Sequence, residues 1–117
     1  MVQKALQAAE TLATEGIGPE VIDLRSLRPI DTVTISESVK LTHKLITVYE
    51  GVKALGIGAE ISAAIAESDA FDCLDAPMAR LGGAEVPTPY SPKLEKAAVP
   101  QVPCIVETCR KLVRGLI

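Results

Sequence analysis

"DLRSLRPID", residues 23–31, joins a short apolar run to a proline and an aspartate, and this order decides how the fold is read. The residues around its start, Glu20–Leu27, are rich in β-formers, so we predict a strand there. Pro29 ends that strand, because proline lacks an amide N–H and pushes Arg28 out of helical geometry. Asp31 then stands where a helix N-cap is expected. The stretch therefore predicts a strand that passes directly into a helix.

The alternation of strands and helices continues on both sides of this stretch. Apolar residues at helical spacing predict a helix before it and three after it, and short β-rich runs predict two more strands. The predicted helices cover residues 2–13, 32–42, 57–65 and 103–114, and the predicted strands cover 20–27, 44–50 and 76–83. Strands that alternate with helices in this way are typical of an α/β domain with parallel strands.

The segment Val86–Pro103 departs from this alternation. It contains five of the eight prolines of the chain, so we predict an extended connection rather than a sheet element. Its apolar side chains, which include Tyr90 and Leu94, are expected to be buried against the rest of the domain. We therefore expect the connection to wrap around the surface of the domain.

Length and charge exclude several classes of function. The chain has 117 residues, which suits one small domain over residues 1–117. Its net charge is −3 without a basic tract, and it has no Trp and one Phe, so we expect neither nucleic acid nor an anionic membrane as a partner. No apolar run reaches the roughly 20 residues of a membrane span, and the N-terminus lacks the pattern of a signal peptide.

The cysteines and the single histidine do not form a recognisable reactive site. Three cysteines without a C-x-x-C spacing indicate reduced thiols in an intracellular protein. His43 is the only histidine, so a zinc site lacks ligands. Cys73 lies between two acidic residues, which disfavour a thiolate, so a Cys–His nucleophile is not expected.

The glycine-rich turn Gly51–Gly58 has two interpretations. It follows a predicted strand and precedes a helix, as in the G-x-G-x-x-G turn that grips a dinucleotide phosphate. Ile61 replaces the third glycine, however, and Ile57 stands where a P-loop has its lysine. A tight strand-to-helix turn is the simpler interpretation, and a small-ligand or nucleotide-phosphate site remains the alternative.

Four charged side chains are further candidates for contacts with a ligand or partner. Glu50 ends a strand at the edge where open α/β sheets place ligands, although a solvated carboxylate is the commoner case. Arg25 and Arg28 have side chains suited to a phosphate or carboxylate, or to pairing with nearby aspartates. Asp75 lies just before the strand predicted over residues 76–83, and it is either a turn residue or a salt-bridge partner.

Three stretches together resemble one known family. "EVIDLRSLRPID" (residues 20–31) is similar to the opening of the transketolase C-terminal domain. "KLITVYEGVKALGIGAEISAAI" (44–65) and "FDCLDAPMARLGGAEVPTPYSPKLE" (71–95) resemble the beta subunits of the decarboxylating component of pyruvate dehydrogenase. The run Gly83–Tyr90 is the most specific part, and it favours the pyruvate enzyme over the branched-chain 2-oxoacid enzyme.

The resemblance implies a three-layer α/β/α fold with a mostly parallel sheet. In this family two strands precede the helix that starts here at Met1, and one of them lies between the strands equivalent to Glu20–Leu27 and Lys44–Glu50. The chain is therefore expected to be an N-terminally truncated domain that lacks these two strands. Because unpaired edges inside a sheet are costly, we expect the gap to be closed by re-pairing, by swapping or by another chain.

The resemblance also implies a function. The family enzyme is an α2β2 oxidoreductase that uses thiamine diphosphate and magnesium to decarboxylate pyruvate, on the route to acetyl-CoA. The domain seen here is expected to hold no catalytic, cofactor or metal residue. It is expected to contact the alpha subunit and a second beta subunit, and to dock the subunit-binding domain of dihydrolipoyl acetyltransferase through Asp75 and Ile117. The mitochondrial matrix is the expected location, with a bacterial cytoplasm or a plastid as alternatives.

Overall fold

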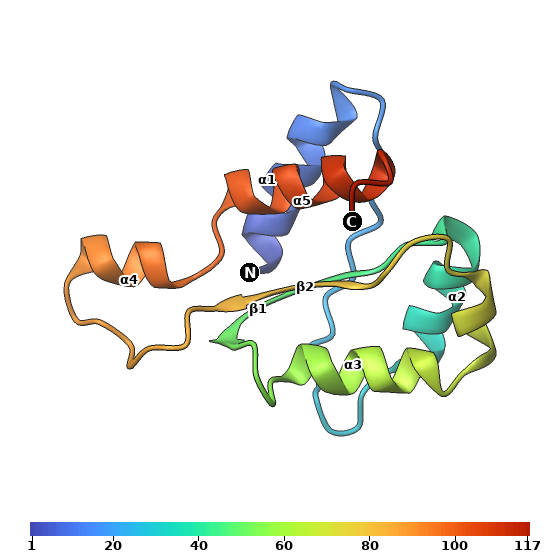
Figure 1. Cartoon of the computed structure of the whole chain (residues 1–117), viewed down its shortest axis with the longest axis horizontal. Helices are drawn as coiled ribbons and strands as arrows, with labels where there is room; N and C mark the ends of the chain where they lie inside the picture. The colour runs from blue at the N-terminus through green and yellow to red at the C-terminus, as the bar shows by residue number, and fades with distance from the viewer.

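The structure is a computed structural model that describes all 117 residues. It contains five α-helices, one short 3₁₀ helix and two strands (Figure 1). None of the helices has the length and apolar character needed to cross a membrane. In chain order the elements are α1 (Val2–Ala13), α2 (Thr32–Thr42), β1 (Ile46–Val52), α3 (Ile57–Ala66), η1 (Asp69–Cys73), β2 (Ala79–Gly83), α4 (Pro92–Ala98) and α5 (Val102–Val113).

The elements form three layers, as the resemblance implied. β1 and β2 pair in parallel, with Ile46 opposite Ala79 and Val48 opposite Leu81. Helices α1 and α5 cover one face of this pair, and α2 and α3 cover the other (Figure 1). Each side has its own small core. The first contains Ala8, Leu12, Ile105, Val106 and Cys109, and the second contains Ile35, Val39, Ile61, Ile65 and Ala70.

Local chemistry sets the helix ends where the sequence predicted them. Asp31 is the N-cap of α2, and one of its carboxylate oxygens accepts a hydrogen bond of 3.0 Å from the Thr34 amide. Pro103 lies in the first turn of α5, where its missing N–H costs nothing. Gly115 follows α5 with a φ of +71°, a backbone conformation that favours glycine.

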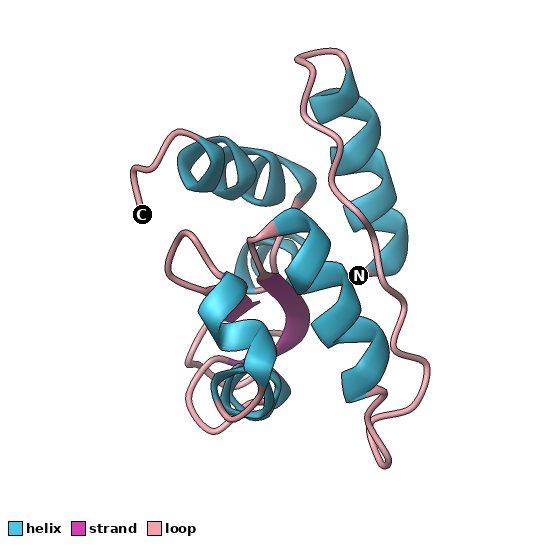
Figure 2. Ribbon diagram, turned by 90° about the vertical axis from the view of Figure 1, so that its right-hand side faces the viewer, coloured by secondary structure: helices cyan, strands magenta, loops and turns pink.

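The strand predicted over Glu20–Leu27 is absent, and that prediction was wrong. These residues form no regular element and pair with neither strand. Figure 2 shows the segment as a loop that runs along one side of the molecule, apart from the strands. A strand exists only through its hydrogen-bonded neighbour, and this segment has none. Of the three ways in which the gap was expected to close, re-pairing with β1 is not found, and a groove remains between the segment and β1. Closure by swapping or by another chain stays a prediction.

The segment Val86–Pro103 also differs from its prediction as an extended connection. It contains the helix α4, which begins at Pro92 directly after Ser91, a favourable start for a helix. The segment does not wrap around the domain but projects from it as an arm (Figure 1). Tyr90 is 100% exposed and Leu94 58% exposed, so the cover expected for them does not come from this chain. We call residues 84–101 the arm.

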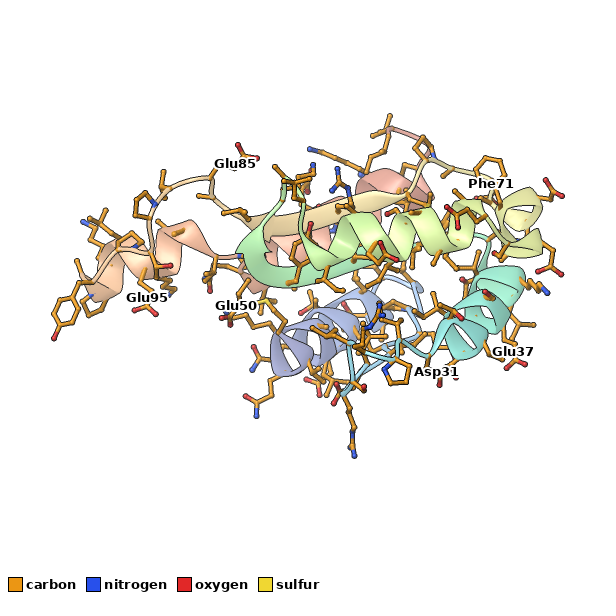
Figure 3. The ribbon with its side chains drawn as sticks, turned by 90° about the horizontal axis from the view of Figure 1, so that it is seen from below. Asp31, Glu37, Glu50, Phe71, Glu85 and Glu95 are labelled. Atoms are coloured by element: carbon orange, nitrogen blue, oxygen red, sulfur yellow. The ribbon has the colours of Figure 1, made fainter.

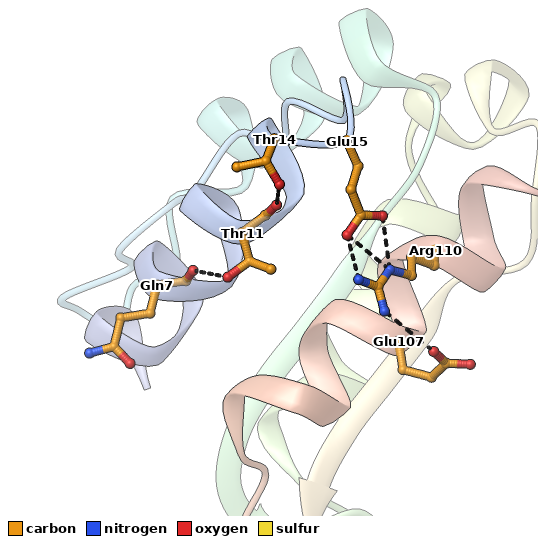
Figure 4. Close-up of polar contacts among 6 residues, drawn as sticks. All are labelled: Gln7, Thr11, Thr14, Glu15, Glu107 and Arg110. Atoms are coloured by element: carbon orange, nitrogen blue, oxygen red, sulfur yellow. Dashed lines mark hydrogen bonds and ion pairs between the residues drawn. The ribbon is translucent and has the colours of Figure 1, made fainter.

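An ion pair joins α5 to the end of α1. Arg110 donates to both carboxylate oxygens of Glu15, and its Nε lies 2.9 Å from Glu15 Oε2 (Figure 4). Within α1 and its end, the hydroxyls of Thr11 and Thr14 donate to the carbonyls of Gln7 and Thr11. The hydrogen bond from Arg110 holds the pKa of Glu15 below its ordinary value, against partial desolvation.

Replacing Glu15 by glutamine is therefore expected to reduce the pH dependence of stability. Because the folded-state pKa is lowered, the ionised carboxylate stabilises the fold at pH 7. This contribution is lost as the pH falls from about 4.3, the ordinary glutamate value, through the folded-state pKa. Thermal melts from pH 7 to pH 3 should show a smaller loss of Tm for Glu15→Gln than for the wild type. Glu10→Gln, on the same helix and outside any ion pair, is the control and should follow the wild type.

Candidate functional site

The first candidate site lies where the two strands begin. Asp75 lies between η1 and β2, and its amide donates to the carbonyl of His43 at 3.0 Å. His43 ends α2 with a φ of +62°. Its Nδ1 lies 2.8 Å from the carbonyl oxygen of Cys73, to which it donates. The backbone thus fixes the loop that presents Asp75, and the histidine supports this loop rather than activating a thiol.

The carboxylate of Asp75 is ionised and accessible. Lys44 Nζ lies 2.7 Å from Asp75 Oδ1, and this hydrogen bond, together with the charge of Lys44, lowers the pKa of Asp75 against partial desolvation. The Asp75 side chain is still 55% exposed. Its second oxygen, Oδ2, makes no hydrogen bond within the chain. That oxygen is therefore free to accept a bond from a cationic donor.

An apolar hollow that the sequence did not indicate lies beside Asp75. Its volume is about 460 Å³, and it is lined by Phe71, Asp72, Leu74, Ala76, Pro77 and Met78. Phe71, which is part of η1, is 51% exposed, and Figure 3 places it near one end of the molecule. Three acids, Asp69, Asp72 and Asp75, accompany this hollow in the sequence. We call the hollow with these acids the Asp75 surface, and it suits a partner that is both basic and apolar.

Ile117, the other predicted docking residue, is the last residue of the chain and is 42% exposed. α5 and the C-terminus lie on the α1 side of the strands, whereas η1, which precedes Asp75, packs against α2 and α3 on the other side (Figure 1). No hydrogen bond or ion pair links Ile117 to Asp75. The structure thus leaves the two predicted docking residues on separate elements with no contact between them.

The second candidate site is the Gly51–Gly58 turn, where glycines allow α3 to pack closely against β1. A Cβ atom at Gly58 would overlap the Tyr49 ring and the Thr47 hydroxyl, because α3 lies directly on β1. A Cβ at Gly56, the N-cap of α3, would overlap the carbonyl of Val52. Close approach of helix and strand therefore explains these two glycines. Glu50 lies at this end of β1 with its side chain exposed (Figure 3).

The remaining candidates are not assembled into a site. Arg25 pairs with Asp23 at 3.6 Å and is largely solvated, while Arg28 forms no ion pair. The three cysteines are free, and burial raises the pKa of the Cys109 thiol. The chain contains no group of three or more His, Cys, Asp or Glu residues that could hold a metal ion.

Comparison with known proteins agrees with the three layers. The family model described as transketolase, C-terminal domain, matches residues 1–105. A solved structure described as "Split gene transketolase, inactive beta4 tetramer" matches with a TM-score of 0.80 and 27% identity, over 97% of this chain and 35% of that one. The structural likeness thus extends over nearly all of this chain but over only about a third of the other protein.

Curated relatives are more similar in sequence. The pyruvate dehydrogenase E1 component subunit beta-1 of Oryza sativa subsp. japonica is 52% identical over 95% of this chain. The corresponding beta subunits of Dictyostelium discoideum and Saccharomyces cerevisiae are 53% and 50% identical, over 96% and 95% of it. The chain spans only 29–31% of the length of these relatives. All three names include "mitochondrial", which confirms the mitochondrial location expected for this chain.

The packing of Gly58 is tested by Gly58→Ala. The added methyl group meets a ring that is held between β1 and α3, and overpacking of this kind typically costs about 1–3 kcal/mol. We expect the free energy of unfolding, measured with urea, to fall by about that amount even though alanine favours helices. Gly18→Ala is the matched control, because nothing lies within 4 Å of a Cβ there. Equal stability of the two variants would contradict the packing explanation.

Proposed function

This chain belongs to the transketolase C-terminal domain family and is homologous to part of the pyruvate dehydrogenase E1 beta subunit, and from this premise we propose that it is an assembly and docking domain of that enzyme. In this proposal the whole enzyme decarboxylates pyruvate oxidatively and passes the acetyl group on. In this proposal the domain provides binding surfaces for other subunits and contributes no catalytic residue. The observation that carries the proposal is the Asp75 surface, an accessible carboxylate beside an apolar hollow.

The partner of the Asp75 surface is the subunit-binding domain of dihydrolipoyl acetyltransferase. A basic side chain of that domain pairs with the free Oδ2 of Asp75, and an apolar side chain fills the hollow beside Phe71. Ile117 contributes its carboxylate as a second contact with the same partner. Charge pairs of this kind steer association and set specificity, while the filled hollow supplies desolvated contact area.

The arm is the surface for subunit pairing. Val86, Tyr90 and Leu94 are each more than half exposed on a segment that projects from the domain. Exposed apolar side chains grouped in this way mark protein interfaces. The partners are the alpha subunit and a second beta subunit.

Thiamine diphosphate and magnesium belong to the whole enzyme in this proposal. The residues of this chain do not fit either group, because it has neither a metal-ligand cluster nor glycines that open a phosphate turn. Bound elsewhere in the enzyme, thiamine diphosphate would supply the carbanion-stabilising chemistry of the decarboxylation. No step of that chemistry passes through the residues described here.

The alternative is a self-standing domain that binds a small ligand or nucleotide phosphate at Gly51–Gly58. It requires that the glycines leave room for a phosphate, whereas Gly56 and Gly58 are closed by Val52 and Tyr49. The alternative predicts that a nucleotide raises the Tm of the chain. The docking proposal predicts that it does not.

The docking proposal is tested with Asp75→Asn. Calorimetric titration of the chain with the subunit-binding domain should show a Kd weakened by about tenfold, because a charge-assisted pair becomes a neutral one. Binding of the wild type should also weaken as salt is raised. Asp23→Asn, which likewise removes a carboxylate from an exposed ion pair, should bind normally. Unchanged binding by Asp75→Asn would refute the role given to this residue.

The arm is tested with the double variant Tyr90→Ala/Leu94→Ala. Both side chains are exposed in the isolated chain, so its stability should change by no more than about 0.5 kcal/mol. Assembly with co-expressed alpha subunit, followed by size-exclusion chromatography with light scattering, should fall strongly. Leu41→Ala removes another exposed leucine, on α2, and should assemble as the wild type does. Normal assembly of the double variant would show that the arm is not an interface.

A further inference from the structure

Two hydroxyl side chains of the arm stand directly before a proline. They are Thr88 and Ser91, and no other serine or threonine of the chain has a proline as its next residue. Ser91 also has a proline two residues before it, in the sequence Pro89-Tyr90-Ser91-Pro92. Proline-directed protein kinases select a serine or threonine by the proline that follows it. The arm therefore carries the sequence pattern of an acceptor for such a kinase, and Ser91 carries the fuller version of it.

The backbone at Ser91 has the conformation that a kinase cleft requires. Its φ of -61° and ψ of 127° are extended, although α4 begins at the next residue. Pro92 favours this geometry, because a proline disfavours helical angles in the residue before it. A kinase holds its substrate so that the acceptor oxygen lies in line with the γ-phosphoryl group of ATP. An acceptor that is already extended reaches this position with little rearrangement.

The hydroxyl of Ser91 is free to react. A serine at a helix N-cap commonly accepts a hydrogen bond from an amide of the first turn, but the Ser91 side chain makes no such bond. Ser91 is exposed, and its neighbour Tyr90 is 100% exposed. The segment projects from the domain (Figure 1), so the cleft of another protein can close around it. Neither burial nor a hydrogen bond therefore protects the acceptor oxygen.

The helix that follows Ser91 is weak enough to open inside such a cleft. α4 has only seven residues, and none of them is buried. Isolated helices shorter than about 12–15 residues are marginal in water, because their first turn is costly to nucleate. A kinase can therefore hold the residues after Pro92 in an extended conformation with little loss of stability in the rest of the domain.

We propose that Ser91 is the acceptor of a proline-directed protein kinase, and that its phosphorylation prevents the arm from pairing with another subunit. In this step the Ser91 Oγ forms a bond to the γ-phosphorus of ATP. The bond between that phosphorus and the β,γ-bridging oxygen breaks, and ADP and the hydroxyl proton are released. The modification acts on the chain before it assembles, since pairing through the arm would cover Ser91.

The phosphate would lie among the apolar side chains that the pairing role places in the interface. Tyr90 is the preceding residue, and Leu94 lies in the first turn of α4. A phosphoserine carries a charge of about −1.5 to −2 at pH 7, and its desolvation in an apolar interface opposes assembly. This effect rests on the pairing role proposed for the arm, whereas the phosphorylation itself does not.

The first part of the test is a kinase reaction. The chain is incubated with ATP and an active mitogen-activated protein kinase, which is a proline-directed enzyme, and phosphate is located by tandem mass spectrometry. Phosphate should appear at Ser91. Its rate of incorporation should fall by about tenfold or more in Pro92→Ala, which keeps the hydroxyl and removes the residue that the kinase selects. Ser26 is exposed but precedes a leucine, and it should remain unmodified.

The second part measures assembly. Mixed with purified alpha subunit, the phosphorylated chain should form about tenfold less complex than the unmodified chain, measured by size-exclusion chromatography with light scattering. Ser91→Ala, treated with the kinase in the same way, should assemble as the untreated chain does. Both parts use a Thr88→Ala background, so that Ser91 is the only acceptor that precedes a proline.

Three results would count against the proposal in different ways. Absence of phosphate at Ser91, or equal incorporation in Pro92→Ala, would overturn the assignment of the site. Normal assembly of the phosphorylated chain would overturn its effect on pairing. Failure of the unmodified chain to assemble would remove the pairing role of the arm and the effect with it, while the mass measurement would still decide whether Ser91 is the acceptor.

Discussion

Both helical layers of this protein depend on one short pair of parallel strands. β1 and β2 are the only hydrogen-bonded strands, and the two cores lie on opposite faces of them. Ile46 and Val48 pack toward α1 and α5, while Thr47 and Tyr49 lie under α3. Gly58 lets α3 approach β1, and Gly83 lets β2 approach β1 near Glu50, where a Cβ would overlap the backbone. Only 15 of 117 residues are buried, so little else holds the layers together.

Features fixed by neighbouring residues were predictable from the sequence. The cap at Asp31, the proline in the first turn of α5 and the helical stripe of α1 are all local, and all were found. The strand over Glu20–Leu27 was not found, because its existence depends on a pairing partner and not on its own composition. α4 was missed because proline density was read as an extended chain, although Pro92 stands at a helix start.

Some features of the candidate site could likewise be predicted from the sequence, and others could not. The residues alone left Asp75 open between a turn residue and a salt-bridge partner, and its docking role was predicted only through the family resemblance. The structure adds what the sequence did not contain: a free carboxylate oxygen, a lysine partner and a hollow beside Phe71. The hollow arises from the η1 turn and the Pro77 loop folding together, and no spacing in the sequence marks it. The glycines at 51–58 were interpreted mainly as a tight strand-to-helix turn, with a ligand site as the alternative, and Gly56 and Gly58 are packing positions.

The central claim is that this chain acts as part of a dehydrogenase beta subunit and not as a small protein of its own. The most direct measurement is the intact mass of the native polypeptide in mitochondria of the source cells, captured with an antibody against residues 86–103. The account predicts a polypeptide several times heavier than 12.3 kDa that is captured together with a second, different subunit. A free polypeptide of 12.3 kDa without that subunit would contradict it.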